Sequence, residues 1–190
     1  MKNRKEKGQF GYRNYHKKIQ LMKVAFGAAM ILLQLAARNL TDNEAAKNVL
    51  TIMAILSVLP TANMASPLAA AWNYRTPSDE FFKKVSCQES VGVILYDLII
   101  TSKEAIMPMD AVMVHPQGVF AYCTSAKIDA KKSEKYLNSM FTSHRLDPNV
   151  KVFKEEKTFL KRLESLKPSS QYEDDGSVDY AVNLLKNLSM

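Results

Sequence analysis

The chain has 190 residues, 47% of them hydrophobic and 24% charged, values typical of an ordinary globular protein of modest size. Its net charge of +7 is unevenly distributed: residues 1–78 carry 11 Lys and Arg against 3 Asp and Glu, whereas residues 79–190 carry 15 against 16. A nucleic-acid-binding domain normally presents a basic folded surface, so the near-neutral C-terminal half argues against nucleic acid as a partner. Two cysteines, Cys87 and Cys123, exclude a disulfide framework and indicate free thiols.

Two apolar segments follow a basic stretch at residues 1–20. Residues 21–37 contain only Lys23 and Gln34 as strongly polar members, and residues 49–72 contain no charged residue. As helices they would extend roughly 26 and 36 Å at about 1.5 Å per residue, against a hydrocarbon core of about 30 Å. The pattern predicts a transmembrane helical hairpin within residues 21–75, with the lipid bilayer as its partner.

The flanks of the two segments predict their orientation. Residues 1–23 hold eight Lys and Arg against Glu6 alone, and Arg75, Lys83 and Lys84 follow the second segment. The positive-inside rule then places both termini in the cytoplasm, as in a multi-pass protein of the cell membrane. A secretory signal peptide, a soluble helical hairpin and a re-entrant arrangement are the alternatives. The long basic start and the lack of a polar face in the second segment favour the transmembrane hairpin.

The second apolar segment also predicts helix contacts inside the membrane. Ala62, Ser66 and Ala70 recur every four residues, a spacing of small side chains that lets helices approach closely. Asn63 lies among them, where an amide without a hydrogen-bond partner is unfavourable in lipid. We expect Asn63 to bond to the first helix or to a second copy of the chain. Generic enrichment in small residues is the alternative explanation of the spacing.

Residues 79–167 predict a folded cytoplasmic domain of alternating helices and strands. Helices are expected at 80–90, 129–145 and 155–167, and strands at 91–101, 109–114, 119–124 and 150–153. Pro116 and Gly118 predict a tight turn between the second and third strands. Residues 168–190 add an acidic linker and an amphipathic helix at 179–188. The order α-β-β-β-α-β-α predicts an α+β fold, a mixed sheet covered by helices.

One hairpin of this domain resembles a known family. Asp110 lies in a predicted strand, and Gly118 lies in the turn eight residues later. The apolar rhythm of the two strands comes from Val112, Val114, Val119 and Phe120. This pattern, with the element order, resembles the nuclease-related domain called NERD, of the restriction-endonuclease-like PD-(D/E)XK fold, over about residues 79–165. The resemblance implies a nuclease in which an aspartate and a glutamate hold a divalent metal and a lysine helps to activate or position the attacking water.

The family's catalytic residues are not preserved at the matching positions. Cys123 stands where the glutamate is expected and Ser125 where the lysine is expected. A hard ion such as Mg²⁺ prefers oxygen ligands, commonly carboxylates, which a thiol does not supply. We therefore expect no cofactor, and a membrane-anchored binding or scaffolding protein that recognises another protein or itself. The alternative is a Mg²⁺-dependent nuclease with a relocated site around Asp110, Cys123 and Ser125, helped by Lys127 or Glu104, so the sequence leaves the question of an enzyme open.

Overall fold

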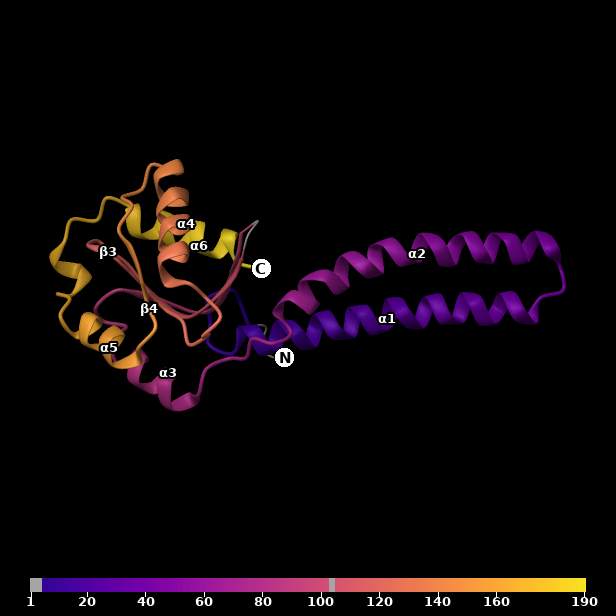
Figure 1. Cartoon of the computed structure of the whole chain (residues 1–190), viewed down its shortest axis with the longest axis horizontal. Coiled ribbons are helices and arrows are strands. Elements are labelled where there is room, and N and C mark those ends of the chain that lie inside the picture. Colours follow the sequence, from indigo (N-terminus) through magenta and orange to yellow (C-terminus); the bar gives the residue numbers. More distant parts are fainter. Residues whose placement is uncertain (1–4, 103–104) are drawn as a thin grey trace. The chain divides into compact units, whose positions relative to one another are not determined.

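A computed structural model of the chain describes residues 5–102 and 105–190 (Figure 1). The chain divides into two compact units. The hairpin unit comprises residues 14–73, and the globular unit comprises the N-terminal residues up to Arg13 together with residues 74–190. Lys2 and Arg4 of the predicted basic stretch lie outside the described residues, as does Glu104.

Two long helices form the apolar part of the chain. Helix α1 spans Tyr12–Leu40 and helix α2 spans Glu44–Ala71, and both are long and apolar enough to cross a membrane. Helix α1 begins nine residues before the apolar stretch, because no Pro or Gly interrupts the polar residues from Tyr12 to Gln20. Helix α2 begins where Asn43 caps it, its side chain accepting hydrogen bonds from the N–H groups of Ala45 and Ala46.

The two helices of the hairpin pack through small and polar residues. A Cβ atom placed on Gly27 would lie 2.5 Å from Thr61 Oγ1, so α1 and α2 approach closely where Gly27 has no side chain. Further along, the Gln34 amide and the Ser57 hydroxyl form a hydrogen bond of 3.4 Å, and Gln34 is buried. These contacts fix which face of α2 meets α1.

The globular unit is α+β, as the sequence predicts. Its elements are α3 (Asp79–Ser86), β1 (Val93–Thr101), β2 (Ile106–His115), β3 (Gly118–Tyr122), α4 (Ala130–Ser143), β4 (Val150–Phe153), α5 (Glu156–Glu164), the 3₁₀ helix η1 (Ser169–Gln171) and α6 (Ser177–Leu188). Every predicted helix and strand is present, in the predicted order. The second strand starts earlier than expected and includes Pro108, and the third ends at Tyr122, before Thr124.

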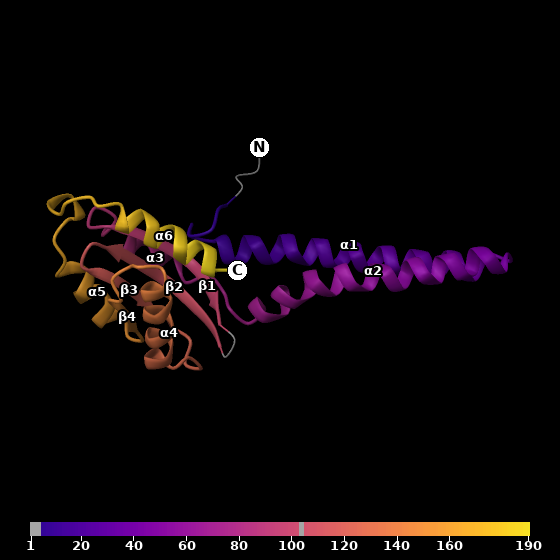
Figure 2. The same cartoon turned by 90° about the horizontal axis from the view of Figure 1, so that it is seen from above.

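The four strands form one mixed sheet in the order β1-β2-β3-β4 (Figure 2). The first two pairings are antiparallel, and β3 and β4 pair in parallel. Helices α4 and α6 cover one face of the sheet, and α3 and α5 cover the other (Figure 1). Each face has its own buried apolar cluster, so the sheet is enclosed on both sides.

Both edges of the sheet are covered by the chain itself. At the β1 edge, Gly8 forms a bridge with Tyr96 and Ser189 forms one with Ile100. At the β4 edge, side chains of α4 accept the outward N–H groups of the strand: Asn138 bonds to Val150, and Glu134 bonds to Val152. Because the edge groups already have partners, the sheet offers little for pairing with a strand of another chain.

Candidate functional site

The structure brings Asp110 next to the loop that carries Cys123 and Ser125, since the Thr124 N–H donates to Asp110 Oδ2, but the predicted site residues lie in different environments. Asp110 is buried in β2, and Cys123 is fully buried in the apolar cluster beneath α4 and α6. Ser125 is half-buried and Lys127 is exposed, both in the loop that follows β3. Cys123 and Ser125 both follow β3, which ends at Tyr122, so neither residue lies in a strand. Among the described residues, no group of three or more His, Cys, Asp and Glu side chains lies close enough together to hold a metal ion.

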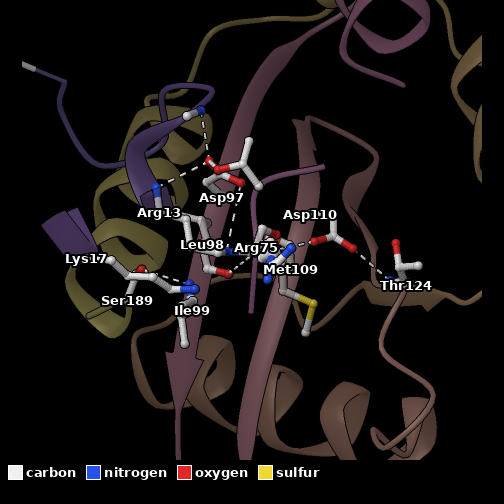
Figure 3. A network of polar contacts seen from close by, with 12 residues as sticks. Arg13, Lys17, Arg75, Asp97, Leu98, Ile99, Met109, Asp110, Thr124 and Ser189 are labelled. Atoms are coloured by element: carbon white, nitrogen blue, oxygen red, sulfur yellow. Dashed lines mark hydrogen bonds and ion pairs between the residues drawn. The ribbon is translucent and has the colours of Figure 1, made fainter. Parts of the chain in front are cut away.

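The Asp110 carboxylate is bonded by the protein on both oxygens (Figure 3). Arg13 Nη1 donates to Oδ1 at 2.9 Å, and the Thr124 backbone N–H donates to Oδ2 at 2.8 Å. Near it, burial raises the pKa of the Cys123 thiol, which favours the protonated and poorly nucleophilic form. These environments match a structural ion pair and a core thiol better than a reactive centre.

Arg13 is the centre of the polar network to which Asp110 belongs. The residue is only 3% exposed, although it lies in the first turn of α1. Besides Asp110, its guanidinium donates to three backbone carbonyls, at 2.6 Å for Arg75, 3.2 Å for Leu98 and 3.1 Å for Met109 (Figure 3). Arg13 therefore contacts the edge strand β1, the neighbouring strand β2, and the chain segment that follows α2.

A second buried carboxylate, that of Asp97 in β1, holds the backbone around Arg13. Asp97 Oδ2 accepts hydrogen bonds from Gly11 N at 2.8 Å, Arg13 N at 3.3 Å and Thr76 Oγ1 at 2.7 Å. Asp97 Oδ1 lies 3.9 Å from Arg13 Nε, and both atoms are buried without a hydrogen-bond partner in the described structure. The two acidic side chains of the network thus share one guanidinium.

Asp97 and Asp110 lie opposite each other in β1 and β2, at a point where the side chains of these strands stop alternating regularly between the two faces of the sheet. The flanking pairs Tyr96–Ala111 and Leu98–Met109 leave the two acids opposite one another, and Asp97 has a positive φ of 59°. In an ordinary strand, side chains three residues apart point to opposite faces. Here Leu95 and Leu98 of β1 enter the same apolar cluster, as do Met109 and Val112 of β2. Because of this irregularity, neither Asp97 nor Asp110 enters the apolar cluster on either face of the sheet.

The charge balance of the network is incomplete. Two buried carboxylates against one guanidinium leave an excess negative charge when both acids are ionised, which is unfavourable in a poorly hydrated interior. Burial accordingly raises the pKa of Asp97, although Arg13 and the hydrogen bonds from Thr76 and Gly11 oppose the change. The surroundings of Asp97 therefore favour the protonated carboxyl more than water does.

Sequence reasoning found Asp110 but missed Arg13, Asp97 and Thr76. The signal for Asp97 was present: it is the only charged residue in the buried strand β1, and a lone acid in an apolar strand requires a basic or hydrogen-bonding partner. The sequence alone does not identify that partner. Arg13 lies 84 residues earlier, among several other basic residues of the N-terminal stretch.

The predicted helix contacts of α2 do not face α1. Ala62, Asn63 and Ser66 are exposed and Ala70 is half-buried, whereas the contact with α1 runs through Thr61 and the Ser57 hydroxyl. The Asn63 side chain has no hydrogen-bond partner among the described residues. Of the two contacts expected for Asn63, the one with the first helix is absent from the described structure.

The likeness of the globular unit to the NERD domain stays a prediction. The element order from α3 to α5 is the expected one, and Gly118 ends the β2–β3 turn with a φ of 137°. Comparisons of the chain with protein-family models, with curated proteins and with solved structures find no match.

Proposed function

We propose that this protein is a membrane-anchored binding or scaffolding protein whose globular unit is a non-catalytic relative of the restriction-endonuclease-like nuclease fold. The observation that carries the proposal is the state of Asp110. A metal-binding carboxylate must have space and uncompensated negative charge for the ion, but Asp110 already forms an ion pair with Arg13 through Oδ1 and accepts the Thr124 N–H at Oδ2. The cation beside Asp110 is therefore the guanidinium of Arg13.

The neighbouring residues support the same proposal. Cys123 is buried in an apolar cluster, while Lys127 is exposed in the loop before α4. Neither provides the second carboxylate or the pocket-lining amine that metal-dependent hydrolysis uses. We infer that the unit needs no cofactor and that its surface, rather than a cleft, is what it contributes to function.

Anchoring in the membrane is supported by the hairpin. Large apolar side chains of α1 and α2 are exposed along both helices, among them Phe26, Leu32, Ile55 and Leu59. Such a surface is stable in lipid and unfavourable in water. Residues before the hairpin and residues after it belong to one globular unit, so a hairpin that crosses the bilayer leaves both of its ends on one side. The basic flanks support the cytoplasm as that side, with the chain multi-pass in the cell membrane.

For the binding role, we propose self-association through the exposed face of α2 around Asn63. The amide has no partner in the described structure, and Pro67, four residues later, has no N–H to donate to the Asn63 carbonyl. Unpaired polar groups are unfavourable in hydrocarbon. A second copy brings the same amide and carbonyl, and the small side chains of Ala62 and Ser66 permit a close approach.

A nuclease assay tests the non-catalytic part of the proposal against the relocated-site alternative. The full-length protein in detergent is incubated with single- and double-stranded DNA and RNA in the presence of Mg²⁺ or Mn²⁺. We expect no cleavage by the wild type. Cleavage that is lost in Asp110→Asn but kept in Lys84→Gln, a change in an exposed ion pair of the same unit, would establish the nuclease instead.

Self-association is tested by sedimentation equilibrium in detergent micelles. Asn63→Leu removes the amide and keeps the helix apolar, so we expect the dimer to weaken by about 5- to 30-fold, as for the loss of about 1–2 kcal/mol of interhelical hydrogen bonding. Asn48→Leu is the matched control, since Asn48 is an exposed amide near the other end of α2. A monomeric wild type, or equal effects of the two changes, would refute association through Asn63.

A further inference from the structure

The Arg13 network lies where the chain enters and leaves the hairpin. The hairpin unit comprises residues 14–73. Arg13 immediately precedes it, and Arg75 and Thr76 are the second and third residues after it. All three belong to the globular unit, and all three contact the same buried carboxylates or the guanidinium between them.

Hydrogen bonds tie these two flanking segments to each other. Arg13 Nη1 donates to the Arg75 carbonyl at 2.6 Å, which joins the segment before the hairpin to the segment after it. Asp97 Oδ2 joins them a second time, because it accepts from the N–H groups of Gly11 and Arg13 and from the Thr76 hydroxyl. Figure 3 shows Arg13, Arg75 and Asp97 gathered on β1 and β2.

The network also reaches across the sheet. Through Arg13 Nη2 it bonds to the carbonyls of Leu98 in β1 and Met109 in β2, and through Asp110 it bonds to the Thr124 N–H beyond β3. Bonds of this kind in a water-poor interior are strong and directional, so a movement of one member changes the geometry of the others. If the segment before or after the hairpin is displaced, the network must therefore either lose hydrogen bonds or shift strands β1 and β2.

One contact in the network is incomplete. Arg13 Nε and Asp97 Oδ1 are buried and unpartnered at 3.9 Å, and an approach of about 1 Å would make them a charge-assisted hydrogen bond. The backbone of Asp97 is held at a positive φ by its surroundings, a feature often found where a structure changes between arrangements. A small shift of Arg13 toward Asp97 would therefore produce a defined second arrangement, in which Arg13 Nε donates to Asp97 Oδ1.

We propose that Arg13, Asp97 and Asp110 form a clamp that couples the two ends of the hairpin to each other and to strands β1 and β2. The clamp makes the globular unit responsive to movement of the hairpin ends, and it makes the spacing of those ends depend on the packing of the sheet. It acts whether or not the unit descends from a nuclease.

Limited proteolysis tests the coupling in one direction. Trypsin cleaves after Arg75, whose carbonyl Arg13 holds, and after Arg145, which is exposed elsewhere in the unit. In the full-length protein in micelles, Arg13→Gln is expected to speed cleavage after Arg75 at least fivefold relative to cleavage after Arg145. Arg13→Lys, which keeps one positive charge but loses the forked donors, is expected to give a smaller increase.

Hydrogen exchange tests the coupling in the other direction. Thr76→Val removes a single hydroxyl after the hairpin and leaves Arg13 in place. We expect exchange of the amides in a peptide covering residues 8–13, before the hairpin, to become at least fivefold faster. Lys84→Gln, which breaks only the exposed ion pair with Glu156, should change neither readout.

The two assays decide the proposal together. If Arg13→Gln unfolds the globular unit, cleavage after Arg145 rises as much as cleavage after Arg75. Arg13→Lys and Thr76→Val then decide the test, because each removes fewer hydrogen bonds. The clamp is refuted if Thr76→Val leaves residues 8–13 unchanged, or if Arg13→Lys leaves cleavage after Arg75 at the wild-type rate.

Discussion

At the residue scale, the buried charges of the sheet decide which substitutions the globular unit tolerates. Removing Arg13 leaves Asp97 and Asp110 facing each other without a cation, an arrangement that is strongly unfavourable in a water-poor interior. We expect Arg13→Met to lower the free energy of unfolding by about 3–5 kcal/mol, measured by pulse proteolysis in urea.

The companion variant makes that measurement specific. Arg13→Met combined with Asp97→Asn and Asp110→Asn removes all three charges, so we expect it to regain most of the lost stability. Lys84→Met, in an exposed ion pair, should leave the free energy of unfolding nearly unchanged. A triple variant no more stable than Arg13→Met would mean that the charges are not the source of the effect.

The charge of Asp97 gives the stability a predictable dependence on pH. Because burial raises the pKa of Asp97 above the ordinary value of 3.8, the folded state holds this proton more tightly than the unfolded state. The contribution of Asp97 is therefore most favourable at low pH and is lost as the pH rises through its folded pKa. Relative to Asp97→Asn, the free energy of unfolding of the wild type should fall as the pH rises from about 4.

His115 shows the opposite dependence on pH. Its Nδ1 accepts from the Gln117 N–H at 3.1 Å and its Nε2 lies 2.9 Å from the Lys167 carbonyl, which defines a neutral ring protonated on Nε2. Burial lowers the pKa of His115 below 6.5, so stability falls as the pH decreases from about 6.5 toward the folded pKa. Nitrogen-15 spectra of the ring at pH 7 should show the Nε2–H tautomer, and the Nδ1–H tautomer would contradict the assignment.

At the element scale, Gly118 fixes the β2–β3 hairpin. Its φ is +137°, and a Cβ atom there would lie 2.5 Å from the Asn149 backbone oxygen. Gly118→Ala combines backbone strain with a backbone clash, and we expect it to destabilise the unit by about 2 kcal/mol or more. Gly176→Ala is the control, because its φ of +73° adds the strain but nothing lies within 4 Å of the new atom. That variant should lose about 1 kcal/mol, and equal losses in the two would remove the clash from the explanation.

Much of the element pattern could be predicted from local signals. Apolar runs and turn residues located all four strands and the turn at Gly118, because these features depend on neighbours in sequence. The boundaries were harder. Helix α1 extends back to Tyr12 through residues with no apolar periodicity. The alternation of β1 changes at Asp97, whose contact with Arg13 joins residues 84 positions apart. Neither effect has a signature within a short window of sequence.

At the scale of the whole molecule, the proposed anchoring predicts how the protein fractionates. After lysis without detergent and high-speed centrifugation, the full-length chain should be in the pellet, resist extraction by alkaline carbonate and dissolve in mild detergent. A reporter placed in the link at residues 41–43, between α1 and α2, should lie across the membrane from one placed after Gly176. Recovery of the chain in the supernatant would contradict membrane anchoring, and reporters on the same side would contradict a hairpin that spans the bilayer.

The sequence predicted the hairpin and the α+β fold separately, but not their shared boundary. Nothing local indicates that residues 5–13, which precede the hairpin, belong to the unit formed by residues 74–190. The link depends on Gly8, which pairs with Tyr96, and on Phe10, which stacks on Phe82 at 4.3 Å. Such long-range contacts follow from the complementarity of folded surfaces, which a single sequence does not display.

The pairing of Gly8 with Tyr96 also orders the events of biosynthesis. The ribosome makes residues 5–13 before the hairpin, whereas strand β1, with which they pair, is translated only after the whole apolar hairpin. In the proposed topology, insertion into the bilayer therefore precedes completion of the sheet, and the leading segment waits undocked while it happens. In a nascent chain stalled before β1, residues 5–13 would be sensitive to protease, and in a chain released after α6 they would be protected.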